Sequence, residues 1–269
     1  MTDRLVSSTQ SELDTEIVER GEEILASKSR AALPPRDAYK VINQAGKYWN
    51  DFYMRNETNF FKDRHWTDRE FEELRSSDAV ILLELGCGVG NFVFPLLESN
   101  PNLFIHACDF SAKAVDLLKE NSNYNTTRCN AFVHDLTKQP LSDKVQPNSL
   151  DIVSNIFCLS AIPPASLEYV IDSIHAVLKP HTGILLFRDY GVYDEAELRF
   201  NGNRRISEHV YARQDGTLAV FFSKEGLKEL FEQRGFEVLE IVYVRKNTVN
   251  RAKGTDSDRV FVQGKFRRL

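Results

Sequence analysis

A glycine-rich turn at residues 84–91, E-L-G-C-G-V-G-N, carries the clearest chemical signal in this sequence. Glycines let a backbone come close to a ligand and adopt positive φ angles that side chains disfavour. The spacing is G-x-G-x-G, whereas a dinucleotide fingerprint places a glycine where this chain has Asn91. Gly86 and Gly88 would face the ligand, and the carboxylate of Glu84 suits the cationic amino-acid end of S-adenosylmethionine. The turn therefore predicts a nucleotide-type cofactor and favours S-adenosylmethionine over NAD.

Two acidic residues end the next two expected strands. Asp109 follows the run at 104–108, and Asp135 follows the run at 131–134. In an open α/β sheet, ligands bind outside the carboxyl ends of the strands. Asp109 could accept hydrogen bonds from ribose hydroxyls, and Asp135 from an exocyclic amine such as that of adenine. Each acid alone is better explained as a helix cap or turn residue, but the two together favour a cofactor site. Ile156 and Phe157, at the end of a further strand, would cover one face of a ring.

Alternating strands and helices must position these residues. Apolar β-type runs predict strands at 80–85, 104–108, 131–134, 150–156, 183–188, 236–245 and 259–266. Periodic apolar positions predict helices at 91–99, 112–121, 165–178 and 224–234. The alternation predicts an α/β, Rossmann-like fold with a mainly parallel, seven-stranded sheet. Because the last two strands have no crossover helix between them, we expect a C-terminal antiparallel hairpin.

The chain divides into three expected parts. Residues 1–36 are polar, contain two adjacent prolines near their end and are expected to form a flexible lead. Residues 37–78 form a helical, aromatic segment that would cap the site. Residues 79–269 form the main domain, with an insertion at 190–222 after the fifth strand. Insertions at the carboxyl ends of strands usually build the substrate side of a site.

Composition limits the classes of protein that fit. The 269 residues are 42% hydrophobic, which supports a sizeable core, and no run approaches the roughly 18 apolar residues of a membrane span. The acidic N-terminus is unlike a secretory or mitochondrial leader, so we expect a cytoplasmic protein, with the nucleus as a second location. Without a C-x-x-C pair, we expect buried, reduced thiols and no metal site. The cysteines are Cys87, Cys108, Cys129 and Cys158.

The net charge of −5 argues against nucleic acid as a partner, but the charges are unevenly distributed. Residues 240–269 hold eight basic residues against three acidic ones. This basic end could bind phosphates, and a solvated charged edge explains it equally well.

Five short segments are informative in combination. They are W-N-D-F-Y at 49–53, N-F-F-K-D-R-H-W at 59–66, the glycine turn at 84–91, A-C-D-F-S at 107–111 and F-R-D-Y-G at 187–191. Together they resemble the tRNA 3-methylcytidine methyltransferases of the methyltransferase-like family. The resemblance runs from about residue 40 to the C-terminus. The run W-T-D-R-E-F-E-E-L at 66–74 looks most like the branch that acts on serine tRNAs.

The resemblance implies a class I methyltransferase that transfers a methyl group from S-adenosylmethionine to N3 of the cytidine at position 32 of the tRNA anticodon loop. It implies cofactor contacts at Trp49, Tyr53, Gly86, Asp109, Asp135 and Ile156. It also implies serine tRNAs as substrates and seryl-tRNA synthetase as a partner. We expect neither DNA nor a membrane as a partner.

Methylation at N3 needs little base catalysis, because neutral cytosine already carries a lone pair there. It needs proximity and in-line alignment. Since the methylated ring is cationic, a carboxylate beside it would stabilise the developing charge. We expect Asp189 to supply this carboxylate and Arg188 to donate to O2 or to a phosphate, because both lie at the end of the fifth strand. A structural salt-bridge network that contains the two is the alternative.

An unstacked loop base could lie on an aromatic platform. The platform candidates are Phe60, Phe61, His65, Trp66 and Tyr190. The phosphate-binding candidates are Lys62, Arg64, Arg204, Arg205, Arg213, Arg259 and Lys265. Three other functions fit less well: an adaptor that binds cofactor and tRNA or synthetase, a small-molecule or protein methyltransferase, and an NAD(P) oxidoreductase.

Overall fold

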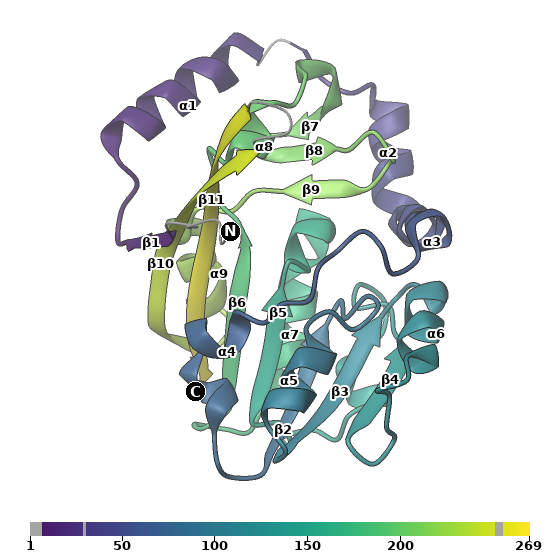
Figure 1. The fold of residues 1–269 in the computed structure, drawn as a ribbon. Helices are drawn as coiled ribbons and strands as arrows, with labels where there is room; N and C mark the ends of the chain where they lie inside the picture. The colour runs from purple at the N-terminus through teal and green to yellow at the C-terminus, as the bar shows by residue number, and fades with distance from the viewer. Residues whose placement is uncertain (1–6, 29–30, 251–254) are drawn as a thin grey trace.

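A mixed sheet of eight strands organises the described part of the molecule (Figure 1). The computed structural model describes residues 7–28, 31–250 and 255–269. The strands of this sheet are β1 (Ser7–Gln10), β2 (Val80–Leu85), β3 (Leu103–Asp109), β4 (Cys129–Val133), β5 (Ile152–Ile156), β6 (Ile184–Tyr190), β10 (Phe236–Asn250) and β11 (Thr255–Arg268). Across the sheet they follow the order β1-β10-β11-β6-β5-β2-β3-β4.

Parallel and antiparallel pairing divide this sheet into two regions. β4, β3, β2, β5 and β6 pair in parallel. β11 then pairs antiparallel with β6, and β10 and β1 continue the antiparallel region. The seven expected strands are all present, and the C-terminal hairpin of β10 and β11 is confirmed. The eighth strand, β1, is an addition that the sequence patterns did not predict.

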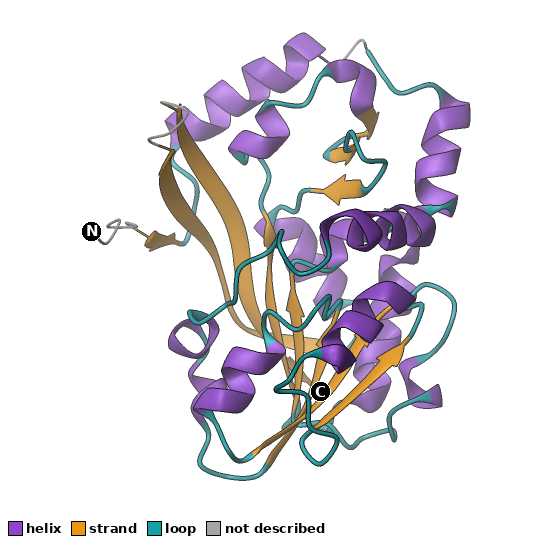
Figure 2. Cartoon of the chain, turned by 45° about the vertical axis from the view of Figure 1, so that its right-hand side comes forward, coloured by secondary structure: helices purple, strands orange, loops and turns teal. Residues whose placement is uncertain are grey.

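Helices cover both faces of the parallel strands (Figure 2). One layer contains α5 (Val93–Ser99) and α6 (Ala112–Glu120), and the other contains α7 (Leu167–Val177) and α9 (Lys224–Glu232). Each layer packs its apolar side against a hydrophobic core of its own. Because both faces of the sheet are covered, β2 is buried along nearly its whole length and shows no polar alternation.

The N-terminal lead differs from the expected flexible segment. β1 pairs with the edge of β10, with Thr9 opposite Val244, and helix α1 (Thr15–Lys28) follows it. An uncovered strand edge exposes unpaired N–H and C=O groups, and β1 covers the part of the β10 edge at 243–246. The sequence could not reveal this pairing, because the two strands lie at opposite ends of the chain.

The segment before the glycine turn is helical, as expected. It contains α2 (Pro35–Asn43), α3 (Ala45–Asn56), α4 (Thr67–Glu70) and the 3₁₀ turn η1 (Glu72–Arg75). Pro35 begins α2, where its missing N–H removes no helical hydrogen bond. Whether this segment acts as a cap stays a prediction.

The insertion after β6 folds into a small sheet of its own. β7 (Arg205–Ser207), β8 (Val210–Ala212) and β9 (Leu218–Val220) pair antiparallel, and the short helix α8 (Glu195–Leu198) precedes them. Figure 1 shows this sheet in the upper half of the molecule, together with α1 and α2. Among the described helices, none is both long and apolar enough to cross a membrane.

Candidate active site

A cavity of about 600 Å³ lies among the glycine turn, α3, the ends of the parallel strands and the insertion. Part of its wall surrounds the glycine turn and includes Tyr53 and Asp109. Another part is aromatic and cationic and includes Tyr190, Arg213 and Phe261. The cavity therefore joins a surface suited to a nucleotide cofactor with a surface suited to a base and its phosphates.

The glycine turn has the backbone conformation that its sequence predicts. Gly86 and Gly88 have φ angles of 63° and 52°, in the left-handed region that side chains disfavour. A Cβ at Gly86 would overlap the Sγ of Cys158, and a Cβ at Gly88 would overlap the hydroxyl of Tyr53. A larger residue at either position would strain the turn and displace the cavity wall.

Asp109 ends β3 and lines the cavity. Its Oδ2 accepts a hydrogen bond from the Gly88 N–H at 3.0 Å, and its Oδ1 accepts one from the Ser111 N–H at 2.9 Å. Burial raises the pKa of Asp109 to about 6, although both N–H groups oppose the shift. The N-cap of α6 is Ser111, so helix capping does not explain the carboxylate of Asp109.

Trp49, Tyr53 and Asp135 also line the cavity, as predicted for cofactor contacts. Asp135 accepts hydrogen bonds from the Thr137 hydroxyl at 2.6 Å and the Lys138 ammonium at 2.8 Å. Burial would raise the pKa of Asp135, but these hydrogen bonds outweigh burial and lower it. The Nε1–H of Trp49 is buried without a partner in the described residues. Because an unsatisfied buried donor is costly, it marks a place for a ligand acceptor.

The structure differs from the expectation for Glu84 and Ile156, whose side chains do not line the cavity. Glu84 is 1% exposed, and its Oε1 lies 3.8 Å from Nη1 of Arg64. Burial raises the pKa of Glu84 well above its usual range, with the charge of Arg64 opposing the shift. The Ile156 side chain lies in the core, and its carbonyl accepts from Arg64 Nη1 at 2.9 Å. Of the two apolar residues expected at this strand end, only Phe157, which has a φ of 59°, lines the cavity.

Asp189 does not line the cavity either, which corrects its expected contact with the base. It is fully buried, and its two oxygens accept hydrogen bonds from the backbone N–H groups of Ser160 and Tyr190, both at 2.9 Å. Burial raises the pKa of Asp189 to about 6, with these bonds opposing the shift. Since Ser160 and Tyr190 do line the cavity, Asp189 acts on its wall from behind.

Arg188 points away from Asp189, because successive side chains of a strand face opposite sides of the sheet. Its Nη1 donates to Gln263 Oε1 at 3.1 Å and lies 3.5 Å from Glu70 Oε2. Its guanidinium lies 4.4 Å from the ring centroid of Trp66, and burial lowers its pKa to about 10. Arg188 therefore supports the cavity wall through Trp66 and does not line the cavity itself.

The aromatic and cationic wall brings together residues that are distant in sequence. The rings of Phe157, Tyr190 and Phe261 have centroids 5.3 to 6.2 Å apart. Arg213 lies 5.7 Å from the Tyr190 ring centroid, and Arg259 lies 5.6 Å from it. The sequence analysis named the two arginines and Tyr190 but missed Phe261, whose only signal is its place two residues after Arg259 on a β-type run.

Four side chains of the segment at 60–66 meet the cavity. They are Phe61, Lys62, Arg64 and Trp66. Phe60 and His65 are outside the lining and exposed, and the Phe60 ring packs on Phe61 with centroids 4.8 Å apart. Platform roles for Phe60 and His65 therefore need a substrate that extends beyond the cavity.

The basic C-terminal region does not form an unpaired phosphate-binding face in the residues that the structure describes. Lys265 lies 2.9 Å from Glu73, and Arg245 lies 2.5 Å from Asp14. Arg204 is half-buried in the insertion and does not line the cavity.

The cysteines Cys87, Cys108, Cys129 and Cys158 are buried with free thiols, as expected. No group of three or more potential metal ligands occurs among the described residues.

Comparison with known proteins decides the family. A family model described as a methyltransferase domain matches residues 83–185. The human tRNA N(3)-cytidine methyltransferase METTL6 is 50% identical, over 84% of this chain and 81% of its own length. This chain belongs to the tRNA N(3)-cytidine methyltransferase family. METTL2 from Danio rerio is 40% identical over 88% of this chain and 77% of its own length. The relative trm141 from Schizosaccharomyces pombe is 42% identical over 86% of this chain and 95% of its own length.

Solved structures with low sequence identity share the fold of this chain. An S-adenosylmethionine-dependent methyltransferase from Anabaena variabilis superimposes with a TM-score of 0.61 at 14% identity, covering 83% of this chain and 95% of the other. An S-adenosylmethionine-dependent methyltransferase from Methanosarcina mazei superimposes with a TM-score of 0.54 at 17% identity. That match covers 74% of this chain and 96% of the other. The class I fold is thereby confirmed.

S-adenosylmethionine is the cofactor of this methyltransferase, and the residues around the glycine turn fit it. The positive φ angles of Gly86 and Gly88 allow close backbone approach. The carboxylate of Asp109 can accept from ribose hydroxyls, and the unpaired Nε1–H of Trp49 can donate to the ligand. The individual cofactor contacts stay predictions. Glu84 does not line the cavity, so any effect it has on the cofactor would pass through its ion pair with Arg64.

Proposed function

We propose that this enzyme methylates N3 of cytidine 32 in the anticodon loop of serine tRNAs. The observation that carries the proposal is the aromatic and cationic wall of the cavity, formed around Tyr190 and Phe261, in the same cavity as the glycine turn. The relatives named tRNA N(3)-cytidine methyltransferase support the reaction at about 50% identity. The run at 66–74, which resembles the serine-tRNA branch, supports the choice of tRNA.

The residues of the cavity suit a reaction that depends on alignment. Neutral cytosine presents its N3 lone pair without a base, so the protein must hold the ring in line with the methyl group that S-adenosylmethionine supplies. A flipped loop base can stack on aromatic rings, which Phe157, Tyr190 and Phe261 provide. Because the product ring is cationic, Arg213 and Arg259 are better placed against phosphates or O2 than against the reacting edge.

The role proposed for Asp189 is positional. Its hydrogen bonds to Ser160 and Tyr190 fix two parts of the wall against which the base would stack. Its negative charge lies behind the wall, where it would stabilise the positive charge that develops on the ring. Arg188 in turn fixes Trp66 by packing against its ring.

The charge distribution supports a requirement for a partner protein. The chain carries a net charge of −5, and most described basic residues near its C-terminus form ion pairs. The cavity is lined by the cations Lys62, Arg64, Arg213 and Arg259 and by Lys138, which pairs with Asp135. Together they can contact only a short stretch of RNA backbone. We therefore propose that seryl-tRNA synthetase presents the tRNA, that the enzyme binds RNA and not DNA, and that it acts in the cytoplasm and the nucleus.

Methyl transfer to tRNA tests this function directly. Labelled S-adenosylmethionine is incubated with the enzyme and total tRNA, with and without seryl-tRNA synthetase, and the nucleosides are analysed. We expect 3-methylcytidine in serine tRNAs and a higher rate with the synthetase. Label in other tRNAs would revise the substrate set. Cofactor binding without label in any tRNA would favour a cofactor-binding adaptor or a small-molecule or protein methyltransferase.

A further inference from the structure

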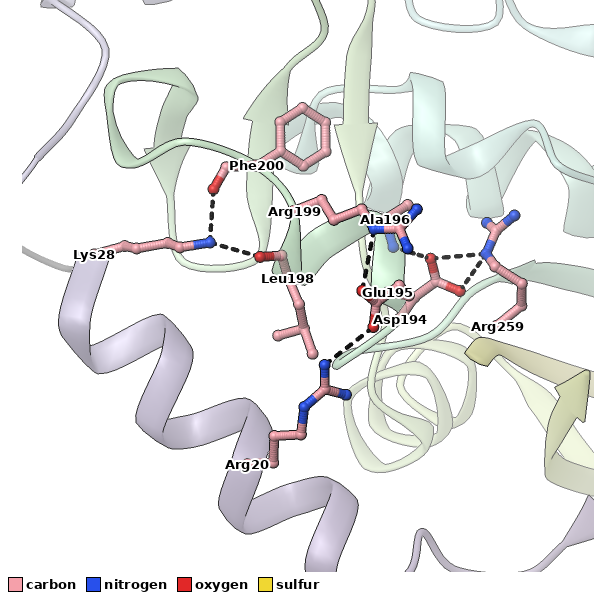
Figure 3. Close-up of polar contacts among 9 residues, drawn as sticks. All are labelled: Arg20, Lys28, Asp194, Glu195, Ala196, Leu198, Arg199, Phe200 and Arg259. Atoms are coloured by element: carbon pink, nitrogen blue, oxygen red, sulfur yellow. Dashed lines mark hydrogen bonds and ion pairs between the residues drawn. The ribbon is translucent and has the colours of Figure 1, made fainter. Parts of the chain in front are cut away.

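Asp194 is a buried acid that holds one arginine of the cavity wall (Figure 3). Its two oxygens accept hydrogen bonds from Nε of Arg259 at 3.1 and 2.9 Å. They also accept from the backbone N–H groups of Ala196 at 2.8 Å and Val260 at 2.7 Å. Charge-assisted hydrogen bonds of this kind are strong and directional. The orientation of the Arg259 guanidinium is therefore set by Asp194.

The same acid lies beside a contact made by the N-terminal helix α1. Arg20 of α1 donates at 3.3 Å to the side chain of Glu195, which directly follows Asp194 in the chain. Lys28 donates to the carbonyl of Leu198, the last residue of α8, at 2.5 Å and to that of Phe200, two residues later, at 3.0 Å. Figure 3 shows these contacts on one side of α8 and the Arg259 contact on the other.

The packing of α1 on this region is close. A Cβ on Gly21 of α1 would overlap the ring of Tyr193, the residue before Asp194. Tyr193 itself has a φ of 63°, which is strained for a residue with a side chain. A strained conformation persists only where its surroundings determine it, and α1 is one of the elements that contact Tyr193.

We propose that Asp194 is a positioning residue for Arg259, and that α1 contributes to substrate turnover by holding α8 and Asp194 in place. The proposal rests on the proposed function, in which Arg259 contacts the RNA. It gives the N-terminal lead a role although α1 does not line the cavity. Without Asp194, the flexible Arg259 side chain would have to be ordered by the substrate itself, which costs side-chain entropy at each binding event.

The first test is a double-mutant cycle between Asp194→Asn and Arg259→Ala. Each single variant should lower kcat/KM for tRNA by about ten- to a hundred-fold, as expected for loss of a buried charge-assisted hydrogen bond. The double variant should be no worse than Arg259→Ala alone, because the two residues act through one contact. The Kd for S-adenosylmethionine should stay within about twofold of wild type in all three.

A matched control is Asp151→Asn. Asp151 also accepts from a backbone N–H, that of Ile81 at 2.9 Å, and pairs with a cation, Lys179 at 2.5 Å, but it lies at the opposite ends of the strands. This variant should lose stability and keep its kcat/KM. Additive losses in the cycle, or an Asp194→Asn enzyme with wild-type kcat/KM, would overturn the positioning role.

The contribution of α1 is tested by Lys28→Met and Lys28→Arg. The methionine keeps the apolar stem but cannot donate to the α8 carbonyls, so kcat/KM should fall by about two- to fivefold. Arginine can donate again and should restore it. Lys228→Met, on the exposed side of α9, is the control and should match wild type. A Lys28→Met enzyme with wild-type turnover would overturn the part assigned to α1.

A readout without RNA separates this proposal from the proposed function. The Nε–H signal of Arg259 in ¹⁵N NMR, assigned by its absence in Arg259→Lys, should be protected from exchange in wild type and lose that protection in Asp194→Asn. A signal that stays protected in Asp194→Asn would overturn the positioning role. If wild type methylates no tRNA while the NMR result holds, the proposed function fails and the Asp194–Arg259 coupling stands.

Discussion

Asp109 and Gly88 are joined by a hydrogen bond of 3.0 Å that ties the end of β3 to the glycine turn after β2. One carboxylate thus fixes the turn and at the same time faces the cavity. The bond explains why an acid at this strand end and a glycine in the neighbouring turn occur together. It also makes the cofactor site sensitive to the protonation of Asp109.

The affinity for S-adenosylmethionine should depend on the ionisation of Asp109. Its pKa is raised to about 6 by burial, so the carboxylate is ionised above that pH and can accept from ribose hydroxyls. We expect the Kd to rise as the pH falls below about 6, because protonation removes an acceptor. Calorimetric titrations at several pH values measure this. Asp109→Asn should bind about tenfold more weakly with little pH dependence, and identical pH profiles would contradict the assignment.

Replacing Trp49 with phenylalanine should weaken cofactor binding while keeping the aromatic wall. The unpaired Nε1–H of Trp49 is the group that changes, and one hydrogen bond to a ligand corresponds to a loss of about three- to tenfold in Kd. Trp66→Phe is the matched control. Trp66 also lines the cavity, but its ring packs on Arg188 and its Nε1–H is not a buried, unpaired donor, so the Kd should stay unchanged. Equal affinities of wild type and Trp49→Phe would show that the cofactor does not use this donor.

Arg64→Ala should destabilise the protein as well as weaken RNA binding. Arg64 is the cation nearest to the buried Glu84, and its loss leaves that acid without a compensating charge. We expect the free energy of unfolding to fall by about 3 kcal/mol in urea titrations. A Glu84→Gln change in the same protein should recover part of the loss. The exposed neighbour Lys62 serves as control: Lys62→Ala should reduce the salt dependence of RNA binding and leave stability unchanged.

The insertion should lose stability as the pH rises through the titration of His209. Burial would lower the pKa of His209, but its 2.7 Å contact with the buried Glu197 outweighs burial and raises the pKa above 6.5. A raised histidine pKa stabilises the fold fully below the unfolded-state value, and this contribution disappears as the pH passes the folded-state value. The melting temperature of wild type relative to His209→Asn should therefore decline as the pH rises from about 6 to 8.

Asparagine is the informative replacement at this position. His209 has a φ of 54°, which asparagine tolerates well, and its amide can donate to Glu197 at every pH. A constant difference in melting temperature across the pH range would show that His209 does not change its charge there.

Local patterns in the sequence determined the parallel strands, the C-terminal hairpin, the positive-φ glycine turn and the acid at the end of β3. These features depend on residues close together in the chain: the periodicity of apolar side chains, the conformational freedom of glycine and the point at which a strand ends. Trp49 and Tyr53 were predicted from the segment at 49–53, which resembles the family, and Asp135 from its place after a strand; all three line the cavity.

Only the tertiary structure decided which side chains of the strand ends reach the cavity. Glu84, Ile156, Arg188 and Asp189 all lie at strand ends, yet helices and neighbouring strands cover each of them. The pairing of β1 with β10 and the contact of Asp194 with Arg259 also depend on residues that are distant in sequence. Such contacts form only when the whole chain packs, because burial and long-range hydrogen bonding, not local propensity, provide their free energy.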